Sequence, residues 1–180
     1  MLIETQRLII RDLKSEDEKA FVEMASDGSL NDIGFDESCG TWMTAWITEA
    51  QQFAIRNNPR KDYLAYVITL KNENEVIGSV GCSYYEDLNE VGITYFIGAQ
   101  YRNAGYAVEA VQAYTKYFFS NYDIQKMIAT IRAENVPSWK VVEKVDFLLT
   151  EKKMYRDLND SKEEMYHFYE IKGLSGRKQN

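Results

Sequence analysis

The stretch of residues 93–110 restricts the fold of this chain more than any other part of its sequence. It begins with β-branched and aromatic residues that predict a strand, breaks at Gly98, passes through a short polar loop and continues after Gly105 as a long helical pattern. The amide N–H groups that begin a helix have no partner within the helix, and the helix dipole favours negative charge there. The stretch therefore predicts a strand, a loop and a helix that together bind a phosphate group.

The other hydrophobic patterns along the chain predict a single α+β domain. Apolar residues in alternation indicate strands, and apolar residues at helical spacing indicate helices. Their order favours a mostly antiparallel central sheet of about seven strands flanked by about four helices. The expected strands cover residues 2–11, 63–70, 75–85, 90–97, 126–133, 147–156 and 164–171, and the expected helices cover residues 15–27, 41–56, 105–119 and 137–144.

The composition narrows the function classes. The 180 residues fit one domain over residues 1–172, followed by a flexible tail over residues 173–180. The formal net charge of −7 argues against nucleic-acid binding, which needs a basic face, and suits a cationic substrate. No apolar run approaches membrane-spanning length, and the N-terminus lacks a signal-peptide pattern. Cys39 and Cys82 have no metal-ligand or disulfide spacing, so we expect a cytoplasmic protein without a metal. Both a monomer and a homodimer remain open.

Several motifs in this chain resemble the GNAT superfamily of N-acetyltransferases. Residues 102–107 fit the pattern Arg/Gln-x-x-Gly-x-Gly/Ala that marks acetyl-CoA binding there, and the longer run 105–110 is similar to the ribosomal-protein alanine N-acetyltransferase (RimJ/RimL-like) branch. Further similarities lie at residues 5–11, 76–81 and 135–147, all in the order expected of the family. The resemblance covers residues 2–171, and it implies one GNAT-type domain with the acyl-CoA N-acyltransferase fold.

The resemblance implies how acetyl-CoA is held. In the superfamily, the strand before the loop binds the pantetheine arm through its main chain, as if the arm were another strand. That implies Tyr95, Phe96 and Ile97 here, with little chemical constraint on their side chains. The main chain of the loop is expected to hold the pyrophosphate, with closer approach where Gly105 lacks a Cβ atom. These loop residues are Arg102, Asn103, Ala104, Gly105, Tyr106 and Ala107, and the Arg102 side chain is expected to add a charge-assisted contact.

Two residues near position 137 resemble further family positions. Asn135 resembles an asparagine that contacts the cofactor arm, although it also suits a turn or helix cap before Pro137. Ser138 resembles a serine that hydrogen-bonds the sulfur as the thiolate leaves; a serine in the first turn of a helix can instead bond its own backbone. Many superfamily members carry a tyrosine four residues later as general acid, where this chain has Val142.

A general base for the reaction is harder to identify in the sequence. The transfer needs a neutral amine near the thioester carbonyl, a donor for the oxyanion and help for the departing thiolate. Glu90 is the leading candidate for the base, because it begins the strand that enters the loop and alternation places it with Gly92 on one face. The alternative is a solvated carboxylate at the end of a strand.

The acceptor site is the part that the sequence defines least. In the family, the loop over residues 28–40 and the helix after it form a wall of this site. Aromatic residues four apart on a helix more often pack in a core than form a binding cage, so both interpretations stay open. An acidic group in the loop (Asp32, Asp36 and Glu37) either attracts a cationic amine or simply faces solvent. The candidate acceptor contacts are Phe35, Trp42, Trp46, Tyr84 and Tyr155.

These features predict an acetyl-CoA-dependent N-acetyltransferase. It moves an acetyl group to a primary amine, either a protein N-terminus or a small amine, by direct attack in a ternary complex. The alternative is a CoA-binding module without catalysis, because Asp146 stands where the family has glycine and Val142 where it often has tyrosine. A third possibility is a protein that binds another phosphate ligand. The sequence does not identify the acceptor.

Overall fold

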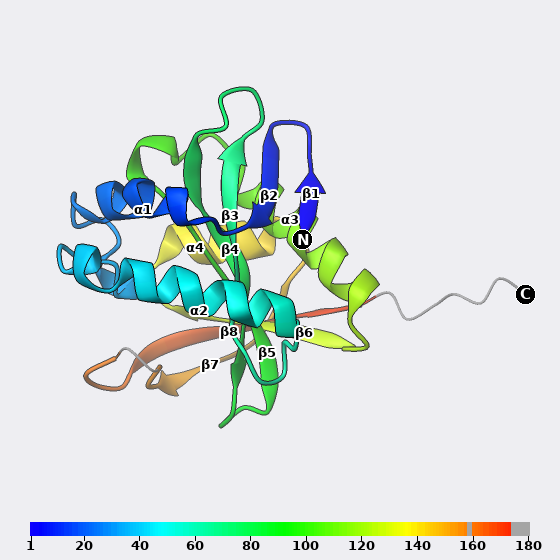
Figure 1. Cartoon of the computed structure of the whole chain (residues 1–180). Helices are drawn as coiled ribbons and strands as arrows, with labels where there is room; N and C mark the ends of the chain where they lie inside the picture. The colour runs from blue at the N-terminus through cyan, green and yellow to red at the C-terminus, as the bar shows by residue number, and fades with distance from the viewer. Residues whose placement is uncertain (158–159, 174–180) are drawn as a thin grey trace, which may run out of the picture.

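A computed structural model describes residues 1–157 and 160–173 of the chain. Eight strands form one sheet in the order β1-β2-β3-β4-β5-β6-β8-β7 (Figure 1). Neighbouring strands pair antiparallel except β5 and β6, which are parallel. The strands are β1 (Leu2–Glu4), β2 (Leu8–Asp12), β3 (Leu64–Leu70), β4 (Val76–Tyr85), β5 (Glu90–Ile97), β6 (Lys126–Arg132), β7 (Leu148–Tyr155) and β8 (Glu164–Lys172).

Helices cover both faces of the sheet, which confirms the predicted α+β class. Figure 1 shows α1 and α2 in front of the sheet and α3 and α4 behind it. Strand β3 illustrates why: its side chains alternate between the two cores, with Tyr66 packed in the α3/α4 cluster and Val67 packed with α1 and α2. The helices are α1 (Glu18–Ala25), α2 (Met43–Arg56), α3 (Tyr106–Asn121) and α4 (Val136–Glu143).

The predicted single strand over residues 2–11 is wrong. Thr5 ends β1, because its N–H donates to the Leu8 carbonyl at 2.9 Å and its hydroxyl accepts the Leu8 N–H at 2.9 Å. The chain therefore turns back, and β1 pairs antiparallel with β2. This hairpin makes the sheet one strand larger than the seven that the alternation predicted, since a local side-chain bond leaves no mark on apolar periodicity.

The sheet divides between β5 and β6. Strand β5 pairs with β4 along its whole length, from Glu90 to Ile97. With β6 it forms a single aligned pair, Gly92 with Ile128. In Figure 1, β3 and β4 run from top to bottom, whereas β6 and β8 lie across the lower part of the molecule. Beyond Gly92, residues 93–97 of β5 therefore present an edge that β6 does not cover, which we call the open edge.

Gly92 comes just before the open edge, and packing explains why this residue is a glycine. A Cβ atom at this position would lie 2.5 Å from Cε2 of Tyr85, well inside contact distance. The Tyr85 ring therefore lies against the backbone of Gly92, and burial raises the pKa of Tyr85 to about 12. Glycine at position 92 follows from this close contact between neighbouring strands.

The chain after β8 continues the sheet for one more residue. Gly173 donates its N–H to the Gln125 carbonyl at 2.9 Å. The rest of the predicted flexible tail, residues 174–180, lies outside the described residues, as do residues 158–159. Within the part of the chain that is described, no helix is long and apolar enough to cross a membrane.

Candidate active site

The loop over residues 98–108, here called the glycine loop, presents a row of free amide donors. A 3₁₀ turn (Ala99–Tyr101) is followed by two residues with left-handed backbone, Asn103 at φ 64° and Gly105 at φ 81°. The N–H groups of residues 103–108 donate to none of the described residues, and the first paired amide after them is that of Glu109, which donates to Gly105 at 3.2 Å. Residues 102–105 are exposed. Free donors at the N-terminus of a helix suit an anion, and binding of a pyrophosphate by these residues stays a prediction.

Arg7 adds a cation to the glycine loop that we did not predict as part of the site. Its guanidinium donates to the Ala104 carbonyl at 2.8 Å and lies 4.6 Å from the centre of the Tyr106 ring. It also pairs with Glu109 at 2.7 Å, and Glu109 accepts from the Thr5 hydroxyl at 2.6 Å. The similarity to the family at residues 5–11 was the available signal, because Thr5 and Arg7 both bind the first turn of α3.

Glu109 is ionised in this arrangement. Burial opposes its ionisation, but hydrogen bonds from Thr5 and Arg7 more than offset burial and hold the pKa of Glu109 below its ordinary value. Its role is structural: it fixes the N-terminal hairpin to α3.

The Arg102 side chain hydrogen-bonds to two main-chain carbonyls of the protein and does not project freely into solvent. Its Nε donates to the Ile97 carbonyl at 3.0 Å, and Nη2 donates to the Ser29 carbonyl at 3.1 Å. The guanidinium therefore joins the glycine loop to the segment of residues 28–40, which we call the aromatic loop. Its contact with a pyrophosphate stays a prediction.

The three residues predicted to bind the pantetheine arm all lie on the open edge. Tyr95 and Ile97 pack toward α3 and α4, and Phe96 packs on the other face, with its ring centre 4.9 Å from that of Phe35. The Tyr95 hydroxyl donates to the Ser138 carbonyl at 2.7 Å. These side chains pack on both faces of the strand, and binding of the pantetheine arm through its main chain stays a prediction.

The N-terminus of α4 lies opposite the open edge. Asn135 caps the helix, its side-chain oxygen accepting the Ser138 N–H at 3.3 Å, so the predicted cap is confirmed while contact with the cofactor stays a prediction. Ser138 is partly exposed, whereas Val142 is fully buried. Burial raises the pKa of Tyr95, and hydrogen bonding with Ser138 partly opposes the shift, so the two side chains are neighbours. The hydrogen bond between Tyr95 and Ser138 therefore connects β5 to α4 across the gap in the sheet, where β5 and β6 separate beyond Gly92.

Asp146 occupies a position that needs left-handed backbone. It follows α4 with φ 66°, while the Phe147 N–H closes the helix end by donating to the Val142 carbonyl at 3.1 Å. Glycine suits such a position best, and aspartate is among the few other residues that adopt it readily. The aspartate at position 146, where the family has glycine, is therefore compatible with this helix end.

Glu90 lies on the α1/α2 side of β5, as alternation predicted, since Val91 and Ile93 are buried on the opposite face. It begins the strand three positions before Ile93, roughly 10 Å along the strand from the near end of the open edge. Its carboxylate pairs with the Lys126 ammonium at 2.6 Å, and this pairing raises the pKa of Lys126. Glu170 is the second carboxylate near Lys126, at 3.8 Å. The role of Glu90 as a general base stays a prediction.

The aromatic residues proposed for the acceptor pocket form a packed cluster. Phe35 is 9% exposed, and its ring centre lies 5.3 Å from that of Trp42 and 5.4 Å from that of Trp46, both edge-to-face. Phe21 completes the cluster on the inner side. Core packing thus accounts for these side chains. They can still position the aromatic loop beside the acceptor.

Tyr84 and Tyr155 both contact the turn between β4 and β5. Tyr84 packs toward α3 and α4 and donates to Asn89 at 2.5 Å in this turn. Tyr155 contacts Phe168 edge-to-face at 5.3 Å, and burial together with a hydrogen bond to Asp87 raises its pKa. Contact of either tyrosine with an acceptor stays a prediction.

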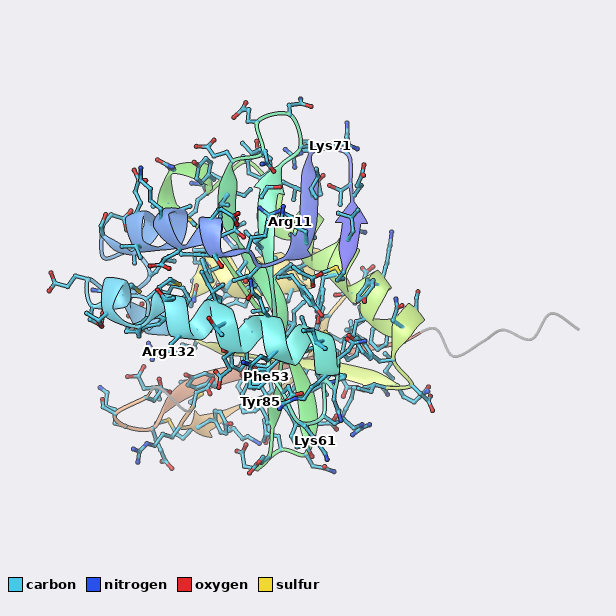
Figure 2. All side chains as sticks on the ribbon, viewed as in Figure 1. Arg11, Phe53, Lys61, Lys71, Tyr85 and Arg132 are labelled. Atoms are coloured by element: carbon cyan, nitrogen blue, oxygen red, sulfur yellow. The ribbon has the colours of Figure 1, made fainter. Side chains whose placement is uncertain are left out.

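Arg132 is the centre of a group of polar contacts that the sequence did not predict. It donates to the Tyr166 hydroxyl at 3.3 Å and pairs with the buried carboxylate of Asp160. Asp32 of the aromatic loop lies 4.0 Å from the same guanidinium. In the view of Figure 2, Arg132 and Tyr85 lie between α2 and the β7–β8 hairpin. Arg132 thus links the end of β6 to segments from two distant parts of the chain, and no local pattern marks such a residue.

Comparison with known proteins identifies the family. The model of the acetyltransferase (GNAT) domain matches residues 7–148 of the 180. The chain belongs to the GNAT family. It is a GNAT N-acetyltransferase that uses acetyl-CoA. An uncharacterized N-acetyltransferase of Bacillus subtilis, YnaD, is 30% identical over 146 residues, covering 81% of each chain.

Solved GNAT structures share the fold. An acetyltransferase from Bacillus anthracis superposes with a TM-score of 0.79 at 22% identity, covering 96% of this chain and 99% of its own. RimL, a ribosomal alpha-N-protein acetyltransferase in complex with coenzyme A, superposes with a TM-score of 0.80 at 16% identity, covering 96% and 98%. The predicted GNAT fold and its RimJ/RimL-like character are confirmed.

Proposed function

We propose that this enzyme transfers the acetyl group of acetyl-CoA directly to a primary amine, either a protein N-terminus or a small amine, within a ternary complex. The observation that carries the proposal is the row of unpaired N–H groups at residues 103–108, next to the open edge of β5. A pyrophosphate on the row and an arm along residues 97–93 would bring the thioester to the region between Gly92 and Ser138. The free amides and the open edge therefore suit acetyl-CoA, the acetyl donor that the family uses.

The two cysteines support direct transfer. A thiolate nucleophile would have to ionise and reach the thioester. Cys39 and Cys82 are both buried, and burial raises the pKa of Cys82 to about 12. A cysteine-bound acetyl intermediate is therefore excluded from this proposal, and the amine attacks the thioester itself.

In this scheme the amine arrives from the α1/α2 side of β5 and Glu90 removes its proton. The carboxylate lies on that face near the end of the open edge, and Lys126 holds it in place at 2.6 Å. An α-amine has a pKa of about 7.7–8.0 against about 10.4 for lysine, so a protein N-terminus needs less help from a base that is already ion-paired. RimL, an alpha-N-protein acetyltransferase, fits the same preference.

Once the tetrahedral intermediate collapses, the C–S bond breaks and the thiolate of CoA leaves. The N-terminal turn of α4 supports this step, because Ser138 and the positive end of the helix dipole lie beside the proposed position of the sulfur. Ser138 is proposed to donate a hydrogen bond to the departing thiolate.

Thiol release from acetyl-CoA, measured against a panel of amines, tests the proposal. The panel contains peptides that begin with Ala or Ser, polyamines and aminoglycosides. Release above the rate without amine, together with a thermal shift on adding CoA, would support it. A thermal shift with no turnover on any amine would favour a catalytically silent CoA-binding module, and no thermal shift would overturn the cofactor assignment.

A further inference from the structure

Tyr95 reaches across the gap in the sheet to the helix that supports the leaving group. Its backbone belongs to the open edge of β5, and its hydroxyl lies 2.7 Å from the Ser138 carbonyl at the start of α4. The two residues are 43 positions apart in the chain. The Tyr95 side chain is partly exposed. A phenol hydroxyl therefore stands next to Ser138, where the proposed path of the thioester passes.

Helix α4 itself supplies no phenol at this place. Val142, one turn after Ser138, is fully buried among the apolar residues of the core. The other tyrosine that bonds α4 is Tyr169 of β8, which donates to the Glu143 carboxylate at 2.9 Å, at the far end of the helix. Among the described residues, Tyr95 is the tyrosine whose hydroxyl contacts the N-terminal turn of α4.

We infer that Tyr95 is a catalytic residue whose phenol hydroxyl donates a hydrogen bond to the thioester sulfur as the C–S bond breaks. The inference rests on the proposed function, because it takes the thioester to lie along the open edge. The hydroxyl hydrogen rotates about the C–O bond, so the oxygen that donates to Ser138 at rest can donate to the sulfur when the arm is bound.

The chemistry balances without a net change at Tyr95. The amine nitrogen forms a bond to the thioester carbon, and the carbonyl electron pair moves to oxygen. Collapse of this intermediate restores the C=O bond and breaks the C–S bond, with the electron pair leaving on sulfur. The amine proton passes to the base, and the thiolate takes a proton from water. Tyr95 keeps its own proton throughout and stabilises the negative sulfur by donation.

Burial of the Tyr95 ring is consistent with this role. It raises the pKa of the phenol, with hydrogen bonding to Ser138 as an opposing influence. A thiol ionises with a pKa of about 8.5, so a phenol above its ordinary value of about 10 donates a hydrogen bond to the thiolate without losing its proton. The hydroxyl therefore remains a donor across the whole neutral and mildly basic range.

The first test compares Tyr95→Phe with Tyr169→Phe. Both changes remove one hydroxyl that joins a strand to α4, so they match in chemistry and differ in position. We expect Tyr95→Phe to lower kcat about 10- to 100-fold with the Kd of CoA within about twofold of the original, because a hydrogen bond to a charged atom is lost. Tyr169→Phe should keep kcat within about threefold.

Several outcomes would overturn the inference. These are an unchanged kcat in Tyr95→Phe, an equal loss in both variants, or a parallel loss of CoA affinity and kcat, which would indicate a structural tether. Failure of the original enzyme to bind CoA would instead refute the proposed function. The two failures are therefore distinguishable by calorimetry on the unmodified protein.

A second test keeps the hydroxyl and changes only its acidity. Site-specific replacement of Tyr95 by a trifluorotyrosine lowers the phenol pKa and retains the ring. We expect kcat of this variant to fall at high pH as the phenol ionises and stops donating, at a pH where the original enzyme shows no fall. An unchanged pH profile of kcat would contradict the inference, even if Tyr95→Phe proved too unstable to study.

Discussion

The open edge and the glycine loop take their main-chain groups from one continuous segment, whereas the contacts around Arg132 are assembled from segments far apart in the chain. Residues 93–108 supply both the open edge and the row of free amides. Arg132 joins Asp32, Asp160 and Tyr166, which belong to the aromatic loop and the β7–β8 region. The first region therefore depends on backbone geometry and the second on side chains, so substitutions should separate them.

The largest effect is expected from Gly105→Val. A β-branched residue at φ 81° is strained, and a Cβ atom added there would lie 3.4 Å from Nη2 of Arg7, so the loop would have to shift. We expect the Kd of CoA to rise about 1,000-fold, or roughly 4 kcal/mol, because several charge-assisted hydrogen bonds are lost together. Isothermal titration calorimetry measures this change.

Gly34→Val is the matched control for that substitution. Gly34 has φ 80°, and a Cβ atom added there would meet nothing within 4 Å, but this glycine belongs to the aromatic loop. Gly34→Val therefore introduces similar backbone strain away from the amide row, and the Kd of CoA should stay within about threefold of the value for the original enzyme. Comparable weakening of CoA binding in both variants would mean that strain, rather than loss of the amide row, is being measured.

Arg132→Gln should disrupt the contacts around Arg132 and leave CoA binding at the glycine loop intact. It leaves the Asp160 carboxylate, 7% exposed, without its cation, and loss of one member of a buried pair typically costs about 3 kcal/mol. Urea unfolding measures the loss of stability, and the Kd of CoA should stay unchanged. Lys153→Gln, which removes an exposed pair with Glu151, should cost less than about 1 kcal/mol.

Glu90→Gln tests whether the strand that holds the cofactor also supplies the base. If Glu90 accepts the amine proton, kcat should fall about 10- to 100-fold with CoA affinity retained. Glu170→Gln removes the other carboxylate near Lys126 and should change kcat less than about threefold. Equal effects of the two changes would show that the charge around Lys126, and not a base at Glu90, controls the rate.

The smallest effect is expected from Glu109→Gln, which loosens the N-terminal hairpin from α3. The folded pKa of Glu109 lies below its ordinary value near 4.5, so its stabilisation is present above that pH and disappears as the pH falls through the folded pKa. We expect a loss of about 1–2 kcal/mol at pH 7. Urea unfolding from pH 7 to pH 3 should show the difference between the two proteins shrinking below about pH 4.5. A difference in unfolding free energy that does not change with pH would contradict stabilisation by the ionised Glu109 carboxylate.

Local patterns predicted most of the fold, and the exceptions share a cause. The strands and helices follow apolar periodicity, and the glycine loop is contiguous, so its position and its donors were predictable. The β1–β2 turn was missed because it depends on one Thr5 hydrogen bond. The side-chain contacts of Tyr95 and Arg132 were missed because their partners lie 43 and 28 positions away. Contacts across such distances are decided by tertiary packing, which leaves no periodic signal in the sequence.

The open edge of β5 has a consequence for the protein when CoA is scarce. Unpaired main-chain donors and acceptors on a strand are a template on which a strand from another molecule can assemble. An arm lying along residues 93–97 removes that template and also stabilises the folded state in proportion to the logarithm of its concentration. Acetyl-CoA would then act as a protective ligand as well as a substrate. The supply of the metabolite would set how long the enzyme stays dispersed in solution.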